Sequence, residues 1–150
     1  MRSLTFFVPS ARRHRKTGRS LPLPGRNELE NDARSNRYAA GAAKRGETER
    51  VAAICRAAMA EQGWSAPPEG VRVEVSLVWS EVHGRESHSA RDQDNITAYQ
   101  KPLLDGLVMA GAIADDDQRH IAGCSRNYLR VDKENPGVLV ELAEISEEGL

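Results

Sequence analysis

Alternating apolar and polar positions along the chain predict four β-strands. The clearest run spans residues 71–79, where VRVEVSLVW alternates almost strictly, as a half-buried strand does. Residues 4–8, before Pro9, predict a first strand. Residues 121–131 and 138–145 predict two more, joined by a turn at Asn135-Pro136-Gly137.

Two other segments have the spacing of helices. Between residues 47 and 62, apolar side chains recur every three or four positions, and Gly63 follows as a C-terminal cap. Residues 99–110 predict a second helix, in which Pro102 would cause a kink if the helix began much earlier. The order β-α-β-α-β-β predicts one α+β domain over residues 1–150, with helices packed on one face of a mixed sheet.

Composition adds two expectations. Aromatic residues make up only 5% of the 150 residues, so the core must be mainly aliphatic. Cys55 and Cys124 stand in no paired motif, which favours two reduced thiols in a cytoplasmic protein. Apolar runs are too short for a membrane span, and the first residues do not resemble a signal peptide.

Charge is distributed unevenly along the chain. Residues 1–50 contain 12 Lys and Arg against 5 Asp and Glu, whereas residues 51–150 contain 9 against 17. This asymmetry indicates a polyanionic partner for the first part. Residues 10–20 predict a flexible basic loop, which is either a solvated insertion or an arm that contacts phosphates. Residues 146–150 predict a frayed acidic tail.

Two acidic clusters flank the second helix. Asp92 and Asp94 precede it, and the run Asp115-Asp116-Asp117 follows it. Carboxylates at this density repel one another unless a cation or strong donors compensate. The clusters are rich in oxygen and poor in His and Cys, which favours Mg²⁺ or Mn²⁺. Since each cluster adjoins a strand, we expect Asp92, Asp94 and Asp116 to meet at one sheet edge.

Lys101 is the cationic residue best placed to act with these acids. Carboxylate-bound metal neutralises a scissile phosphate and activates water, and an ammonium group stabilises the charge that develops in the transition state. Structural explanations compete with this one: Asp94 as a helix cap, residues 115–117 as a solvated turn, and Lys101 with Asp105 as a surface ion pair.

Three segments taken together resemble the RusA family of Holliday junction resolvases, found mostly in phages and prophages. They are Arg91-Asp92-x-Asp94-Asn95, Lys101-Pro-Leu-Leu-Asp105-Gly-Leu and Gly111-Ala-Ile-Ala-Asp115-Asp116-Asp-Gln118. The segments LPGRN at 23–27 and SNRY at 35–38 are similar to the family's N-terminal part. The spacing from Asn95 to Lys101 is longer than in short family members.

The resemblance implies an Mg²⁺-dependent endonuclease that acts as a symmetric homodimer on four-way DNA junctions. Asp92, Asp94 and Asp116 match the family's metal-binding aspartates, and Lys101 matches its essential lysine. Asp115 matches the acid beside the third ligand. From the basic charge and the resemblance we expect DNA contacts from Arg12, Arg13, Arg15, Lys16, Arg19, Asn27, Arg37, Lys44 and Arg91.

Two other functions remain open. One is a metal-dependent nuclease with another preference, such as flaps, single strands or RNA. The other is a non-catalytic DNA-binding protein, in which the acids are structural and residues 10–20 do the binding.

Overall fold

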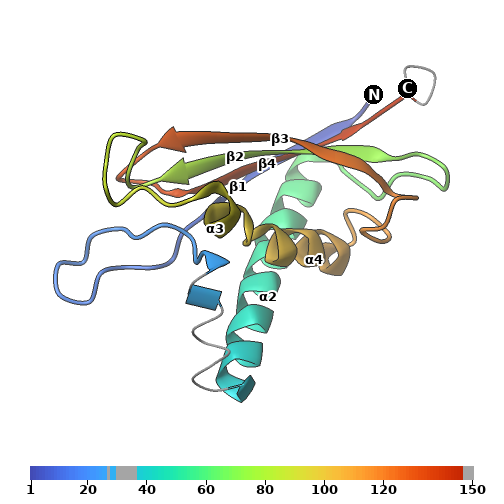
Figure 1. The fold of residues 1–150 in the computed structure, drawn as a ribbon. Helices are drawn as coiled ribbons and strands as arrows, with labels where there is room; N and C mark the ends of the chain where they lie inside the picture. The colour runs from blue at the N-terminus through green and yellow to red at the C-terminus, as the bar shows by residue number, and fades with distance from the viewer. Residues whose placement is uncertain (27, 30–36, 147–150) are drawn as a thin grey trace.

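The computed structural model describes residues 1–26, 28–29 and 37–146 (Figure 1). The predicted α+β class and the order of strands and long helices are confirmed. A short helix, α3, precedes the second long helix. In chain order the elements are β1 (Ser3–Pro9), α2 (Arg37–Gln62), β2 (Val73–Glu81), α3 (Gln93–Thr97), α4 (Gln100–Ala110), β3 (Ile121–Val131) and β4 (Gly137–Glu144).

The described strands form a four-stranded mixed sheet in the order β1-β4-β2-β3. β4 runs antiparallel to both of its neighbours, while β2 and β3 are parallel. In β1 and β2, residues facing the helices are buried and alternate with partly exposed ones. This is the alternation on which the strand predictions rested.

Helices α2, α3 and α4 all lie on one face of the sheet, as predicted (Figure 1). α4 packs closely on α2 at Gly106, where a Cβ would stand 2.4 Å from Cγ1 of Val51. α2 ends at Gln62, and the next residue, Gly63, has φ +71° and so forms the predicted left-handed cap. The core between helices and sheet is mainly aliphatic, with Trp79 and Tyr99 as its largest fully buried side chains.

The chain avoids a kink at Pro102 because the helix does not begin early. α3 and α4 are separate helices, with Ala98 ending the first and Tyr99 capping the second. Pro102 therefore falls in the first turn of α4, where backbone N–H groups have no intrahelical acceptor and a missing donor costs nothing.

Residues 10–22 form a narrow hairpin beside the sheet. The backbone N–H of His14 donates to the carbonyl of Arg19 at 2.8 Å, and that of Leu21 donates to the carbonyl of Arg12 at 3.0 Å. Arg13 and Ser20 form an isolated bridge. The basic segment thus has its own backbone pairing, unlike a disordered insertion; its flexibility stays a prediction.

Cys55 is buried, Cys124 is partly buried, and neither forms a disulfide, as expected from their spacing. Burial raises the pKa of the Cys55 thiol to about 11. In the described part of the chain, no helix has the length and apolar character needed to cross a membrane. The predicted tail falls mostly on residues 147–150, outside the described residues.

Candidate metal and nucleic-acid site

The sheet does not bring the two acidic clusters together in the way the sequence suggested. β2 and β3 are neighbours, as expected, but they are parallel. The carboxyl end of β2, which leads to Asp92, therefore lies at the opposite end of the sheet from the amino end of β3, which follows Asp116. The expected meeting at one sheet edge is wrong, so any approach of the clusters must come through α4 and the turn after it.

The first cluster lies on the exposed loop and first turn of α3. Asp92 stands at the N-cap position but makes no side-chain capping bond. Asp94 lies within the helix, so it is not the cap. The Asp94 Oδ2 instead accepts a hydrogen bond from Nη1 of Arg26 at 3.3 Å. A cation from the N-terminal segment thus neutralises one member of the cluster.

Gly25 permits this contact by allowing the backbone around Arg26 to approach α3. A Cβ on Gly25 would stand 2.5 Å from Oδ1 of Asn95 and 2.6 Å from Nη1 of Arg91. It would also stand 2.9 Å from the backbone oxygen of Asn95. Two segments that resembled the RusA family separately in the sequence therefore touch in the fold.

We expect Gly25→Ala to separate these segments. The new methyl group has no room, and relief of such overpacking costs about 1–3 kcal/mol of unfolding free energy. Chemical denaturation monitored by circular dichroism checks this value. Gly46→Ala, where a Cβ meets nothing within 4 Å, is the matched control. An equal stability of both variants would show that the contact is not tight.

A buried ion pair fixes the start of the acidic loop. Glu81, at the end of β2, is 6% exposed. Its two carboxylate oxygens accept hydrogen bonds from Nε and Nη2 of Arg91 at 2.7 and 2.8 Å. This bidentate geometry holds the backbone just before Asp92. The predicted DNA contact of Arg91 is not supported, because its guanidinium faces Glu81 inside the protein.

Removal of this carboxylate is expected to destabilise the protein strongly. Glu81→Gln leaves the buried Arg91 charge with only the more distant carboxylate of Glu28, at 4.0 Å, which costs about 3 kcal/mol. Urea unfolding measures the change. Glu141→Gln, on the exposed position of β4, should have almost no effect. A loss of less than about 1 kcal/mol in Glu81→Gln would mean that water solvates the pair.

Lys101 connects the second acidic cluster to α4. Its Nζ donates to Oδ1 of Asp105 at 2.9 Å, one helical turn along, and lies 4.0 Å from Oδ2 of Asp116. Gly111, with φ +79°, caps α4 and begins the turn that leads back to Asp116. The hydrogen bond to Asp105 and its charge raise the pKa of Lys101, and the charge of Asp116 adds to this.

The other two acids of the run have different roles. Asp115 accepts a hydrogen bond from the backbone N–H of Asp116 at 2.7 Å. Asp117 accepts from Arg119 and contacts Nδ1 of His120 at 2.6 Å. The hydrogen bonds from Arg119 and His120 lower the pKa of Asp117 to about 2. Asp117 thus organises the turn before β3, as the structural alternative proposed for the run.

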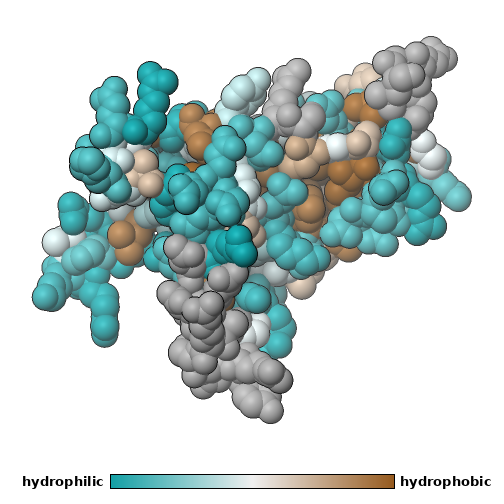
Figure 2. Space-filling model, viewed as in Figure 1, coloured by the Kyte–Doolittle hydropathy of each residue, from teal (hydrophilic) through white to brown (hydrophobic). Residues whose placement is uncertain are grey.

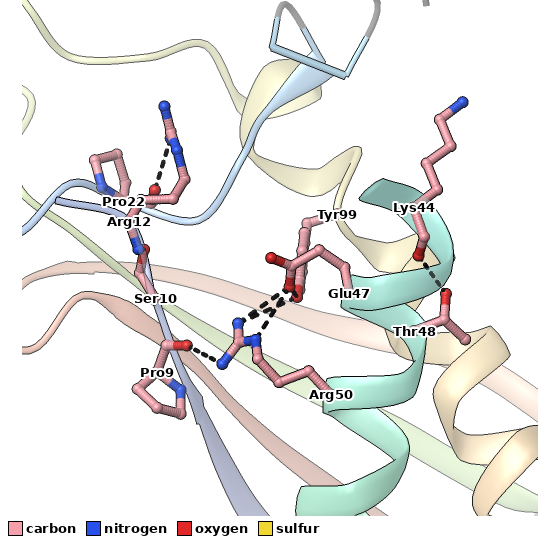
Figure 3. A network of polar contacts seen from close by, with 9 residues as sticks. All are labelled: Pro9, Ser10, Arg12, Pro22, Lys44, Glu47, Thr48, Arg50 and Tyr99. Carbon is pink, nitrogen blue, oxygen red and sulfur yellow. Dashed lines mark hydrogen bonds and ion pairs between the residues drawn. The ribbon is translucent and has the colours of Figure 1, made fainter. Parts of the chain in front are cut away.

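A polar network that the sequence did not reveal anchors the start of α4 (Figure 3). The hydroxyl of Tyr99 donates to Glu47 of α2, and Nη2 of Arg50 donates to the same carboxylate oxygen at 3.1 Å. Nη1 of Arg50 reaches the carbonyl of Pro9 at 2.7 Å. Burial, followed by the bond to Glu47, raises the pKa of Tyr99. The network ties α2, β1 and the residue two positions before Lys101 together.

A cavity of about 300 Å³ lies between α2, α4 and the segment around Arg26. Three cationic side chains line it, Arg26, Lys44 and Lys101, with Asp105 as its acidic member. Arg26 also holds Asp94, and Lys101 also contacts Asp116. Each acidic cluster is therefore linked by an ion pair to a side chain that lines this cavity, while Asp94 and Asp116 themselves are not among its lining residues.

The other residues predicted to contact DNA differ in how far their side chains are bonded within the protein. Arg12 is partly exposed and its Nη1 donates to the carbonyl of Pro22 at 2.8 Å, so its DNA contact stays a prediction (Figure 3). Arg13 donates to Ser20 and Arg19 to Thr17 within the hairpin. Arg15 and Lys16 are exposed at its tip. Asn27 and the side chain of Arg37 lie outside the described residues.

The predicted ligands suit Mg²⁺ in chemistry but not in present arrangement. Asp92, Asp94 and Asp116 supply the hard oxygen atoms that this ion prefers. Among the described residues, however, no three His, Cys, Asp or Glu side chains lie close enough together to hold a metal ion.

Comparison of the chain with protein-family models and with curated proteins gives no match. The residues and contacts described above are therefore the basis for any function.

Proposed function

We propose that this protein is a Mg²⁺-dependent DNA endonuclease that resolves four-way junctions as a homodimer, with Asp92, Asp94, Asp116 and Lys101 at its active site. One observation carries the proposal: Arg26 and Lys101 line the same cavity and each engages a different acidic cluster. The resemblance to the RusA family involves these same segments.

The cavity suits a phosphate group of the DNA backbone. Arg26 and Lys44 offer positive charge from two sides, and phosphate contacts of this kind position nucleic acids without reading their sequence. Lys101 is 72% exposed, so its ammonium group is accessible to a DNA backbone. With its pKa raised by Asp105, it remains an ammonium group and stabilises charge on the scissile phosphate or the leaving oxygen.

The divalent ion belongs to the same proposal. Asp92, Asp94 and Asp116 would hold it, and when bound it would supply charge neutralisation and an activated water. DNA entry provides a reason for the ion pairs to open, because the phosphate competes with Asp94 for Arg26 and with Asp116 for Lys101. A symmetric homodimer matches the junction's approximate two-fold symmetry and supplies two sites for paired nicks.

A second candidate is a non-catalytic DNA-binding protein. The observation that favours it is the neutralisation of Asp94 by Arg26 and of Asp105 by Lys101, which gives these acids a structural role. A nuclease with another substrate preference remains the third candidate.

A substrate panel distinguishes the three candidates. Wild-type protein is incubated in Mg²⁺ with a four-way junction, a flap, linear duplex, single-stranded DNA and RNA of equal length. Our proposal predicts fastest nicking of the junction. Faster cleavage of another substrate would favour the general nuclease. Salt-dependent binding of DNA without cleavage of any substrate, in Mg²⁺ or Mn²⁺, would favour the binding protein.

A further inference from the structure

Two large apolar side chains are exposed near the end of the edge strand β3. Leu129 is 43% and Val131 is 50% exposed. They pair with Trp79 and Glu81 of the parallel strand β2, both of which are buried on the helix side of the sheet. Leu129 and Val131 therefore point to the side of the sheet on which the helices lie, but both side chains remain about half exposed there. Figure 2 shows hydrophobic surface at this end of the strand, bordered by hydrophilic residues.

Leu129 lies at the junction of two hollows. One, of about 490 Å³, is lined by Asp94, Gln100, Asn127 and Leu129. The other, of about 440 Å³, is lined by Leu129 and Val131 together with His83, Arg85 and Arg130. The shared residue makes these hollows neighbours, so the exposed apolar pair adjoins the surface that carries Asp94.

The charge around the apolar pair favours a nucleic acid as its partner. The second hollow has three arginines, of which Arg91 is neutralised by Glu81. Arg85 remains as an exposed cation of this hollow, with His83 beside it. Arg130 also borders the hollow, but its Nε donates to Oγ of Ser80 at 2.7 Å, so its guanidinium lies on the opposite face of the sheet from Leu129 and Val131. An apolar side chain beside a cation is the combination used to part stacked bases while a phosphate is held.

We propose that Leu129 and Val131 form an apolar wedge that contacts unstacked bases at the branch point of DNA and thereby favours branched DNA over duplex. The inference rests on the proposed function for the nature of the ligand. Bases at a branch point are already poorly stacked, so insertion beside them costs less than insertion into duplex. Selection then arises from the cost of unstacking rather than from base sequence.

The test measures binding in EDTA, so that no cleavage is needed. The probe is a synthetic four-way junction with 2-aminopurine at the branch point, whose fluorescence rises when the base unstacks. We expect wild-type protein to raise the fluorescence. The double variant Leu129→Ala/Val131→Ala should lose this rise and bind the junction about tenfold more weakly, with little change in duplex affinity.

Tyr128→Ala is the matched control, because Tyr128 is 61% exposed on the opposite face of the same strand. Leu129→Gln, which keeps the length of the side chain but makes it polar, should also lose the rise. Circular dichroism confirms folding of each variant. Double-variant binding and fluorescence equal to those of Tyr128→Ala would overturn the wedge. The wedge would also be overturned if the wild-type protein were a dimer, the double variant were a monomer, and both gave the same fluorescence. Leu129 and Val131 would then contact a second copy of the chain and not DNA.

Failure of this inference differs from failure of the proposed function. If wild-type protein nicks junctions in Mg²⁺ but the double variant behaves like the control, the wedge is wrong and the nuclease stands. If no cleavage occurs but the fluorescence rise depends on Leu129 and Val131, the wedge stands on a binding protein.

Discussion

Asp94→Asn is expected to lower the rate of junction nicking by about a thousandfold, because the amide is a weak ligand for a hard cation and carries no charge. Junction binding should survive. Asp94 is exposed on α3 and contributes nothing to the core, so the variant should fold. Single-turnover nicking with end-labelled junction measures the rate, and a gel-shift assay measures affinity.

The design of the control matters for this variant. Loss of the Asp94 carboxylate also removes one negative charge beside Arg26, which strengthens the attraction of this surface for phosphate. Affinity for DNA should therefore stay equal or increase. Glu141→Gln removes one negative charge from β4 instead and should leave the nicking rate unchanged. Wild-type nicking by Asp94→Asn would remove this residue from the active site.

Lys101→Ala is expected to reduce nicking by about a hundredfold or more, because a positioned cation that stabilises developing charge contributes that much to the rate. Lys101→Arg should recover only part of the loss, since a planar guanidinium does not place its charge where an ammonium does. Stability should hardly change, because the Lys101–Asp105 pair is an exposed helix pair.

The pH dependence of wild-type nicking gives an independent check on Lys101. Its pKa is raised above the ordinary value of 10.5, so the ammonium is fully present below that pH and is lost only as the pH rises through the raised value. Nicking should therefore show no loss assignable to Lys101 between pH 7 and pH 10. Arg56→Ala on α2 is the control for removal of a cation. Activity of Lys101→Ala within a few-fold of this control would contradict the proposed role.

The fold was largely predictable because its elements follow simple periodicities. Alternation predicted strands such as β2 to within about two residues of their ends, and Gly63 marked the end of α2 correctly. The helix begins earlier than the predicted residue 47. The prediction was too short because Gly41 and Gly46 weaken the helical pattern in the sequence, although they do not break the helix.

The site was less predictable because it depends on strand direction and on long-range contacts. Periodicity does not reveal that β2 and β3 are parallel, so the predicted meeting of acids at one sheet edge was wrong. The pairs Arg26–Asp94 and Glu81–Arg91 join residues whose partnership has no local signal in the sequence. By contrast, the spacing of Lys101 and Asp105 predicted their contact correctly, because positions four apart share a helix face.

The central claim is best tested by mapping nicks on a four-way junction labelled on each strand in turn and incubated with wild-type protein in Mg²⁺. The account predicts two nicks placed symmetrically on opposite strands near the branch point, and none when EDTA replaces Mg²⁺. Junctions that are bound but remain intact in Mg²⁺ and Mn²⁺ would contradict it.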